Sequence, residues 1–409
     1  MFSNFLYLFA ALLLFSTYSP DNEYVFSAVD ILFLGLNLFI FSRLCISRFK
    51  VLDIAMENSI FTLKTQTKYH DISTFLMTLS VVFYFVAIYF LHLKEIIFQV
   101  TGFPKDFFLN DVLGLAFFFC YFYSFWNNSF PYHARLFNST IDRDEYVKSQ
   151  FKFNVPILVP WFCISLLFYF MEETLISFNI TINQNLKDFI VLPLFFLTVA
   201  IFMPLIIKRM WGCESGSGSE TVQELETFCR SKGLKFKAIL IWNVFEGKLF
   251  TAGIMGLVAR FRYILITPVM LNSLTMEELK SVLAHEIGHN KNHHMNFLLF
   301  FFLGFILISI NYPNFLFLFI QYSSILDIDW FLHLFEENST YFSLFWVTVP
   351  IVLLLIIYFR LFFGIFSRAF EREADIHSLQ LMGSADGIVS SLEKIGFYSG
   401  DIRDMPNWH

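Results

Sequence analysis

The chain has 409 residues, of which 56% are hydrophobic and only 15% are charged. Soluble domains carry a charge on about a quarter of their residues, so this composition excludes an ordinary soluble protein. The formal net charge is −6, and no basic stripe lies outside the loops between apolar runs, which argues against nucleic acid as a partner. The five cysteines have no metal-type spacing, and we expect free thiols rather than a disulfide framework.

Eight apolar runs predict membrane-spanning helices. Four of them lack Asp, Glu, Lys and Arg and approach the roughly 20 residues that a helix needs to cross a bilayer; they cover residues 72–93, 153–171, 189–207 and 338–359. Weaker runs cover residues 1–18, 25–42 and 110–127. We expect the first run to be an anchor rather than a signal peptide, because it lacks a preceding basic residue and a following A-x-A-like cleavage site.

The eighth run, residues 295–322, is interrupted by the sequence Asn-Tyr-Pro-Asn at 311–314. We expect one helix followed by a tail on the membrane surface, with a re-entrant hairpin as the alternative. Eight spans place both chain ends on the same side of the membrane.

The distribution of Lys and Arg predicts which side that is. Loops 43–70 and 128–152 carry five and four of these residues, whereas the loops 19–24, 94–109 and 176–188 carry none, two and one. Segment 208–294 carries eleven and the tail after residue 359 carries five. Because basic loops stay in the cytoplasm, we expect both ends and segment 208–294 to be cytoplasmic.

Segment 208–294 is the one substantial soluble segment that the sequence predicts. It opens with a Gly- and Ser-rich connector at 212–219, followed by a helix at 221–231. Extended stretches rich in β-branched and aromatic residues cover 235–243 and 260–268, and the glycine-containing stretch 247–256 between them is a third candidate strand.

The expected fold class is therefore mainly α: a polytopic helical membrane protein with a small α/β cytoplasmic domain. The expected regions are 1–207 (six transmembrane helices), 208–294 (cytoplasmic α/β segment), 295–366 (two transmembrane helices) and 367–409 (cytoplasmic helical segment).

The sequence SVLAHEIGHNKNHH at 281–294 contains four of the ten histidines. Thr275 and Glu278 form a capping-box pattern that starts a helix through this stretch. On a helix, His285 and His289 share one face and can bind one zinc ion, and Glu286 lies beside the first of them, where it can act as a general base. The pattern also occurs by chance in long chains. We expect His293 and His294 to mark the membrane interface.

A catalytic zinc ion needs a third protein ligand, and the sequence FEREAD at 370–375 offers one. Glu371 and Asp375 share a helix face, whereas Glu373 points away from it. One of the pair can bind zinc, and the other can orient a ligating histidine through its second ring nitrogen. The alternative is a solvated acidic patch.

The sequence H-E-x-G-H on a helix that enters a membrane span, followed after two spans by F-E-x-x-A-D, resembles the integral-membrane zinc proteases that comprise the CAAX prenyl endopeptidases and the heat-shock protease HtpX. Because the resemblance is closer to the bacterial branch of this family, we expect a bacterial inner membrane. The resemblance covers about residues 240–400 and implies that the small α/β domain is a zincin-like cytoplasmic protease domain. It implies one Zn²⁺ per chain with His285, His289 and Glu371 as ligands. It also implies Glu286 as the catalytic base and Asp375 as the carboxylate that orients a ligand.

Two features depart from this family. The segment KLFTAG at 248–253 lacks the asparagine of the substrate-aligning strand, and the chain ends at PNWH (406–409), where relatives continue into a His-Pro-rich segment.

We therefore expect an endopeptidase that acts on membrane-associated or misfolded proteins or lipid-modified peptides at the bilayer. A peptide or protein substrate would add as a strand beside 247–253 or 260–267. The alternative is a non-catalytic zinc-binding scaffold or transporter, for which Asp30, near the outer end of its span, is the clearest intramembrane acid. The sequence does not indicate the oligomeric state.

Overall fold

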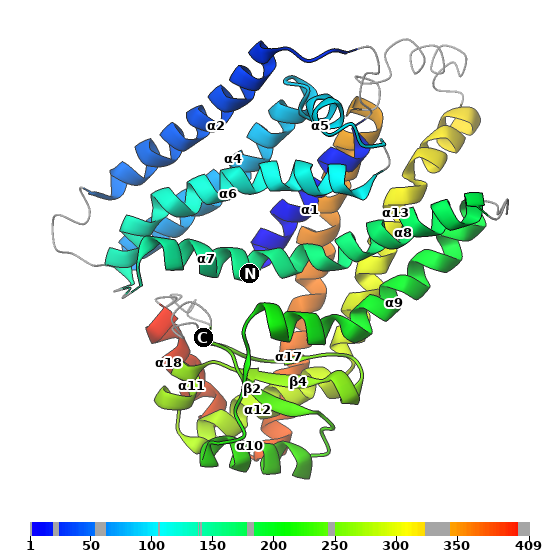
Figure 1. Ribbon diagram of the computed structural model, residues 1–409. Coiled ribbons are helices and arrows are strands. Elements are labelled where there is room, and N and C mark those ends of the chain that lie inside the picture. The colour runs from blue at the N-terminus through cyan, green and yellow to red at the C-terminus, as the bar shows by residue number, and fades with distance from the viewer. Residues whose placement is uncertain are drawn as a thin grey trace.

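The computed structural model describes residues 2–18, 24–53, 63–104, 107–137, 139, 141–177, 184–243, 250–323 and 344–399. Figure 1 shows a large helical bundle above a smaller domain that contains a sheet. The chain passes from the bundle into this domain, returns to the bundle, and comes back to the domain at its C-terminal end. Two crossings of the bundle therefore separate the two parts of the sheet-containing domain.

The bundle is built from long apolar helices, as the composition predicts. Its helices before the sheet are α1 (Phe2–Thr17), α2 (Ala28–Phe49), α4 (Leu63–Tyr89), α5 (Leu93–Thr101), α6 (Phe108–Leu136), α7 (Arg143–Asn154), α8 (Val159–Ser177) and α9 (Gln184–Met210). After the sheet, α13 (His294–Ser323) leaves the domain and α16 (Val349–Ile357) leads back into α17 (Gly364–Met382). The mainly helical fold class is confirmed.

Six helical segments of the described residues are long and apolar enough to cross a membrane: Ala28–Leu52, Thr65–Tyr89, Phe108–Leu136, Arg143–Met171, His294–Tyr322 and Trp346–Met382. They correspond to six of the eight predicted runs; the first part of the run 338–359 lies outside the described residues. The other two runs form the shorter apolar helix α1 and the 27-residue helix α9.

The prediction for residues 295–322 was wrong in one respect. Helix α13 is continuous over its 30 residues and contains Pro313, so neither a surface tail nor a re-entrant hairpin interrupts it. A membrane helix tolerates an internal proline because neighbouring helices and local adjustments of the backbone satisfy the groups that lose their hydrogen bonds.

Helix α1 lies among the other bundle helices. Ala11 and Phe15 are almost completely buried, and a side chain at Gly114 of α6 would collide with the Phe15 ring. Thr348 joins three helices, because its hydroxyl oxygen lies 2.7 Å from the Tyr89 hydroxyl and 2.9 Å from the Thr17 hydroxyl. Small residues and buried hydroxyls are the contacts that hold helices together in lipid.

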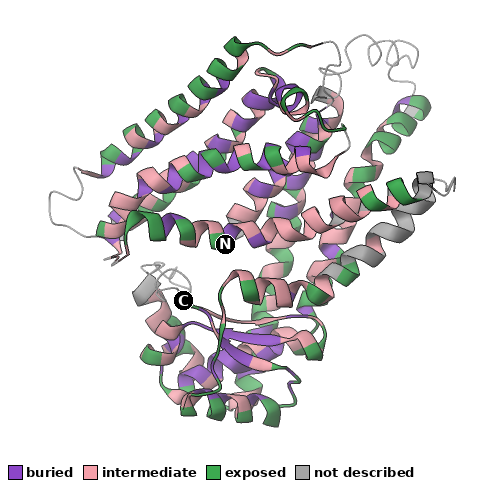
Figure 2. Ribbon diagram, in the orientation of Figure 1, coloured by how far each residue is buried: buried purple, intermediate pink, exposed green. Residues whose placement is uncertain are grey.

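The outer face of the bundle exposes large apolar side chains instead of charged ones. Phe39 on α2 and Phe300 and Phe319 on α13 are each at least 60% exposed, and Figure 2 shows exposed residues along the outer sides of both helices. Exposed apolar surface of this extent is typical of contact with another apolar phase. A lipid bilayer accounts for it.

The sheet has four strands in the order β1-β2-β4-β3: β1 (Glu214–Ser215), β2 (Ala238–Ile241), β4 (Tyr263–Ile266) and β3 (Ala252–Met255). Strands β2 and β4 are parallel, and both edge strands are antiparallel to their neighbours. The predicted connector 212–219 is therefore partly an edge strand. Strand β4 is paired on both sides, which excludes the predicted addition of a substrate strand at 260–267. Strand β3 remains as the edge beside the helix that carries His285 and His289.

The two faces of the sheet pack against different partners, as the alternation of side chains along a strand requires. Ile239 and Ile264 face helices α10 (Glu220–Ser231) and α12 (Met276–Lys291). Leu240 and Leu265 face the bundle, together with Trp211 and Trp242, whose rings stack 4.3 Å apart. The sheet therefore joins the soluble helices to the membrane helices as a middle layer.

Helix α12 begins where the sequence predicts. Thr275 accepts a hydrogen bond from the Glu278 backbone N–H, and the Glu278 carboxylate accepts one from the Thr275 N–H at 2.7 Å. Glu278 also holds the last helix, α18 (Asp386–Ser399), through the Ser390 hydroxyl at 2.5 Å and the Lys394 ammonium at 2.8 Å. Burial opposes ionisation, but these hydrogen bonds outweigh it and lower the pKa of Glu278 to about 2.

We expect Glu278→Gln to lower the free energy of unfolding by about 2 kcal/mol, because the ionised carboxylate and its hydrogen bonds are lost. A depressed pKa stabilises the fold above the carboxyl's unfolded pKa of about 4.3 and stops doing so as the pH falls towards 2. Thermal unfolding in detergent should therefore depend less on pH between about 5 and 2 in the variant. The exposed neighbour Glu277, as Glu277→Gln, is the matched control; equal pH dependence of wild type and Glu278→Gln would contradict this account.

Candidate metal centre

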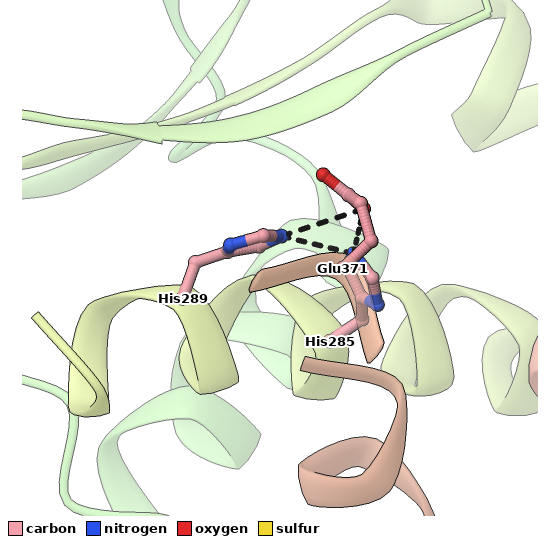
Figure 3. Close-up of side chains that lie close together, drawn as sticks. All are labelled: His285, His289 and Glu371. Atoms are coloured by element: carbon pink, nitrogen blue, oxygen red, sulfur yellow. Dashed lines mark hydrogen bonds and ion pairs between the residues drawn. The ribbon is translucent and has the colours of Figure 1, made fainter. Parts of the chain in front are cut away.

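Three side chains from two helices meet below the edge of the sheet. His285 and His289 come from α12 and Glu371 comes from α17, and Figure 3 shows them pointing at one another. The two histidine Nε2 atoms lie 3.1 Å apart. The Glu371 Oε2 atom lies 3.3 Å from His285 Nε2 and 3.7 Å from His289 Nε2. The structure therefore brings together the three residues that the sequence singled out as possible ligands.

These distances fit a metal ion. Ligand atoms at about 2.1 Å from a tetrahedral zinc ion lie about 3.4 Å from one another, close to the three separations between the ring nitrogens and the carboxylate oxygen. Two imidazoles and one carboxylate are a donor set that zinc accepts, with a fourth position left open. The residues present thus fit a catalytic rather than a closed structural site.

The two helices cross closely at a glycine. A methyl group built on Gly288 would lie 3.0 Å from the Ala374 Cα atom and 3.1 Å from the His377 Cβ atom, which is tighter than ordinary van der Waals contact. Nearby, the Ser378 hydroxyl donates a buried hydrogen bond of 3.0 Å to the Ser281 carbonyl oxygen. This close approach brings Glu371 within reach of histidines that lie more than 80 positions earlier in the chain.

Asp375 lies one turn after Glu371 and contacts the other side of the first histidine. Its Oδ1 atom is 2.9 Å from His285 Nδ1. Burial of His285 favours its neutral form, but Glu371, Glu286 and Asp375 outweigh this and raise the pKa of the imidazole. A carboxylate on Nδ1 leaves Nε2 free for a metal ion, which is the arrangement that orients ligating histidines in known metal sites.

Glu286 faces the cleft between α12 and strand β3. Burial raises the pKa of its carboxyl group, and His289, His285 and a hydrogen bond from the Ile254 backbone N–H work in the opposite direction. A carboxylate with a raised pKa is a stronger base than an exposed one. Its place beside the histidine pair suits the removal of a proton from water in the cleft.

Two residues that sequence reasoning left outside the site also reach it. His294 was expected at the membrane interface, but its side chain is 4% exposed and its Nδ1 atom lies 2.9 Å from His289 Nδ1. Glu373 does point away from the three possible ligands, yet its Oε2 atom lies 3.0 Å from His294 Nε2. His293, directly before His294, has a left-handed backbone conformation with φ of 58°. Asn and His adopt this conformation more often than most residues, so the sequence Asn292-His293 was the available signal for a chain reversal here.

A cleft follows strand β3 past the cluster. On one side, a cavity of about 250 Å³ is lined by Thr251, Ala252, His285 and Glu371. On the other side, a cavity of about 390 Å³ is lined by Ile254, Gly256 and His289. Glu286 lines both. The segment KLFTAG is described only from residue 250 onwards, and PNWH at 406–409 also lies outside the described residues.

We expect Gly288→Ala to weaken Zn²⁺ binding about tenfold, because the added methyl group pushes the Ala374 backbone, and Glu371 with it, away from the histidines. Competition with a chelator on the purified protein measures this affinity. Gly364→Ala, on the partner helix α17, is the control, because its methyl group would make only an ordinary contact of 3.5 Å with Arg368. Equal affinities of Gly288→Ala and wild type would show that the helix crossing does not set the site.

Comparison with known proteins shows that this part of the chain is similar to a family. Residues 220–408 match the model of peptidase family M48. No curated protein matches the chain. Among solved structures, the crystal structure of S. mikatae Ste24p matches over 92% of this chain and 94% of that chain, at 16% identity and a TM-score of 0.41. Residues 220–408, which include the whole cluster, are thus similar to peptidase family M48, and the chain is a membrane metalloprotease.

Proposed function

We propose that this metalloprotease is a zinc endopeptidase that cleaves membrane-associated proteins at the cytoplasmic face of the membrane, with one Zn²⁺ per chain. The observation that carries the proposal is the convergence of His285, His289 and Glu371 beside the buried carboxyl group of Glu286. A structural metal site has no need of a base, whereas a hydrolase does. The site therefore supports catalysis over a scaffold role.

The reaction uses the three ligands and the base in different ways. His285, His289 and Glu371 hold the ion, and zinc, when bound, acts as a Lewis acid that polarises the peptide carbonyl and makes water more acidic. Glu286 takes the proton of the attacking water and passes it to the leaving amine. Asp375 accepts a hydrogen bond from the Nδ1–H group of His285 and so keeps Nε2 of that ring directed at the ion.

The free edge of β3 is the natural place for the substrate backbone. The Thr251 carbonyl oxygen accepts a hydrogen bond from the Thr267 N–H, so the backbone polar groups of Thr251 point towards β4. Because the backbone N–H and C=O groups of successive residues point to opposite sides of an antiparallel strand, those of Ala252 and Ile254 point towards the cleft. The contact of the Ile254 N–H with Glu286 agrees with this direction. An extended peptide paired with Ala252 and Ile254 would cross the cleft beside the ligand cluster.

A third cavity supports an apolar substrate. It measures about 290 Å³ and shares Gly256, Leu257, Met295 and Leu298 with the cavity beside His289. Apart from Met255 of β3, its remaining walls are apolar residues of the membrane helices, including Ala200, Met203, Pro204, Ile207, Leu299 and Phe302. A peptide that follows β3 beyond Ile254 arrives at this cavity. Apolar side chains of membrane or misfolded proteins, and the lipid of a modified peptide, share the chemistry it accepts.

The cytoplasmic orientation rests on the distribution of basic residues. Segment 208–294, which holds the sheet and α12, carries eleven Lys and Arg, whereas the three loops expected on the opposite side before it carry three in all. We propose a bacterial inner membrane as the location. The oligomeric state is left open.

Glu286→Gln tests the proposed reaction. We expect the variant to bind Zn²⁺ as wild type does, because Glu286 is not a ligand, and to lose at least about a hundredfold in kcat, because the base is lost. Cleavage of an unfolded or membrane-derived substrate and the zinc content are measured on the same preparation. Glu371→Ala should instead lose zinc. Equal cleavage by wild type and Glu286→Gln would refute the proposal.

Peptides that differ at one position near the cleaved bond test the apolar cavity. We expect wild type to prefer Leu or Phe over Asp at that position by at least about tenfold in kcat/KM, since apolar burial favours the former and charge burial opposes the latter. Ala200→Phe, which fills the cavity, should reduce cleavage of the Phe peptide and leave that of a Gly peptide unchanged. Leu197→Phe, at an exposed position of the same helix, is the control. Equal cleavage of Asp and Phe peptides by wild type would exclude this role.

A further inference from the structure

The two histidines of the cluster have different partners on their second ring nitrogens. His285 Nδ1 lies directly against a carboxylate, Asp375. His289 Nδ1 lies 2.9 Å from the Nδ1 atom of another histidine, His294. The far nitrogen of His294 then lies 3.0 Å from Glu373 Oε2. A carboxylate therefore stands behind each histidine, once directly and once through an intervening imidazole.

The fold holds His294 in this position on several sides. His293 adopts a left-handed backbone conformation with φ of 58°, which ends α12 and starts α13, so that the next side chain turns back beneath His289. The His294 ring stacks on Phe370 with ring centroids 4.2 Å apart and an interplanar angle of 17°. Because the ring is 96% buried by its surroundings and its two nitrogens both have partners, it has little freedom to rotate.

The hydrogen bonds among His289, His294 and Glu373 are consistent with one placement of the ring protons. A metal ion on His289 Nε2 requires the proton of that neutral ring to be on Nδ1. His289 Nδ1–H then donates to His294 Nδ1, which must lack a proton. The proton of His294 is consequently on Nε2, from which it donates to the Glu373 carboxylate. Every hydrogen bond in this series has one donor and one acceptor, and no group needs to change its charge.

We propose that His294 and Glu373 are positioning residues that fix the orientation and tautomer of His289 and thereby set the affinity of the site for its metal ion. The inference rests on the proposed zinc site and extends it to two residues that do not touch the ion. His294 does most of this, because it contacts His289 itself. Glu373, whose side chain is 56% exposed, acts only through His294 and has the smaller effect.

Four variants separate this role from simple packing. His294→Phe keeps the ring and its stacking on Phe370 but can make neither hydrogen bond. His294→Asn restores an acceptor oxygen near the place of Nδ1. Glu373→Ala removes the last acceptor, and Glu373→Gln keeps an amide oxygen there. His293→Asn is the matched control, since asparagine tolerates the left-handed backbone and the three-residue series is left intact.

The dissociation constant for Zn²⁺, measured by chelator competition on the full-length protein in detergent, is the first readout. We expect His294→Phe to weaken binding by about 10- to 100-fold and Glu373→Ala by less, as is usual when a partner of a ligating histidine is lost. His294→Asn should recover most of the affinity, and Glu373→Gln and His293→Asn should match wild type. The visible absorption of the Co²⁺-loaded protein should change in His294→Phe and not in His293→Asn.

The outcomes separate the two proposals. If wild type does not bind Zn²⁺, the proposed function fails. If wild type binds Zn²⁺ and folded His294→Phe binds it equally, with an unchanged Co²⁺ spectrum, only the positioning role is overturned. If His294→Phe does not fold, the comparison of Glu373→Ala with Glu373→Gln decides, because wild-type affinity of Glu373→Ala contradicts the inference.

Discussion

The crossing of α12 and α17 at Gly288 is the contact on which the site depends. Each helix alone carries an incomplete set of donors, a histidine pair on one and a carboxylate pair on the other. The chain between them passes through the bundle twice, as α13 and then as the helix that contains α16. Because Gly288 has no side chain, the Ala374 backbone approaches closely enough for Glu371 to meet both histidines. The membrane helices therefore assemble the site as well as anchor it.

The site is also held by groups that would not touch a metal ion. Asp375 on one histidine, and His294 with Glu373 on the other, leave both Nε2 atoms directed at the same point. The capping box of α12 extends to α18 through Glu278, so the helix that carries the histidines is fixed at its start as well. The cleft can then accept a substrate without reorganising its donors, which is the condition for efficient electrostatic catalysis.

Much of this was predictable because it depends on local patterns. The capping box, the spacing of His285 and His289, and the shared face of Glu371 and Asp375 follow from helix periodicity alone. The roles of His294 and Glu373 do not, because they arise from the left-handed turn at His293 and from the packing of two helices that are distant in sequence. The continuous helix through Pro313 and the short strand β1 were missed for a similar reason: pairing and packing overrode the local preferences of proline, glycine and serine.

X-ray absorption at the zinc edge of the purified, full-length protein tests the central claim most directly. The account predicts one zinc ion per chain, with nitrogen and oxygen neighbours at about 2.0 to 2.2 Å, including two imidazoles. The histidine scattering should be lost together with the metal in Glu371→Ala. A protein without bound zinc, or zinc with sulfur neighbours at about 2.3 Å, would contradict the assignment of His285, His289 and Glu371 as its ligands.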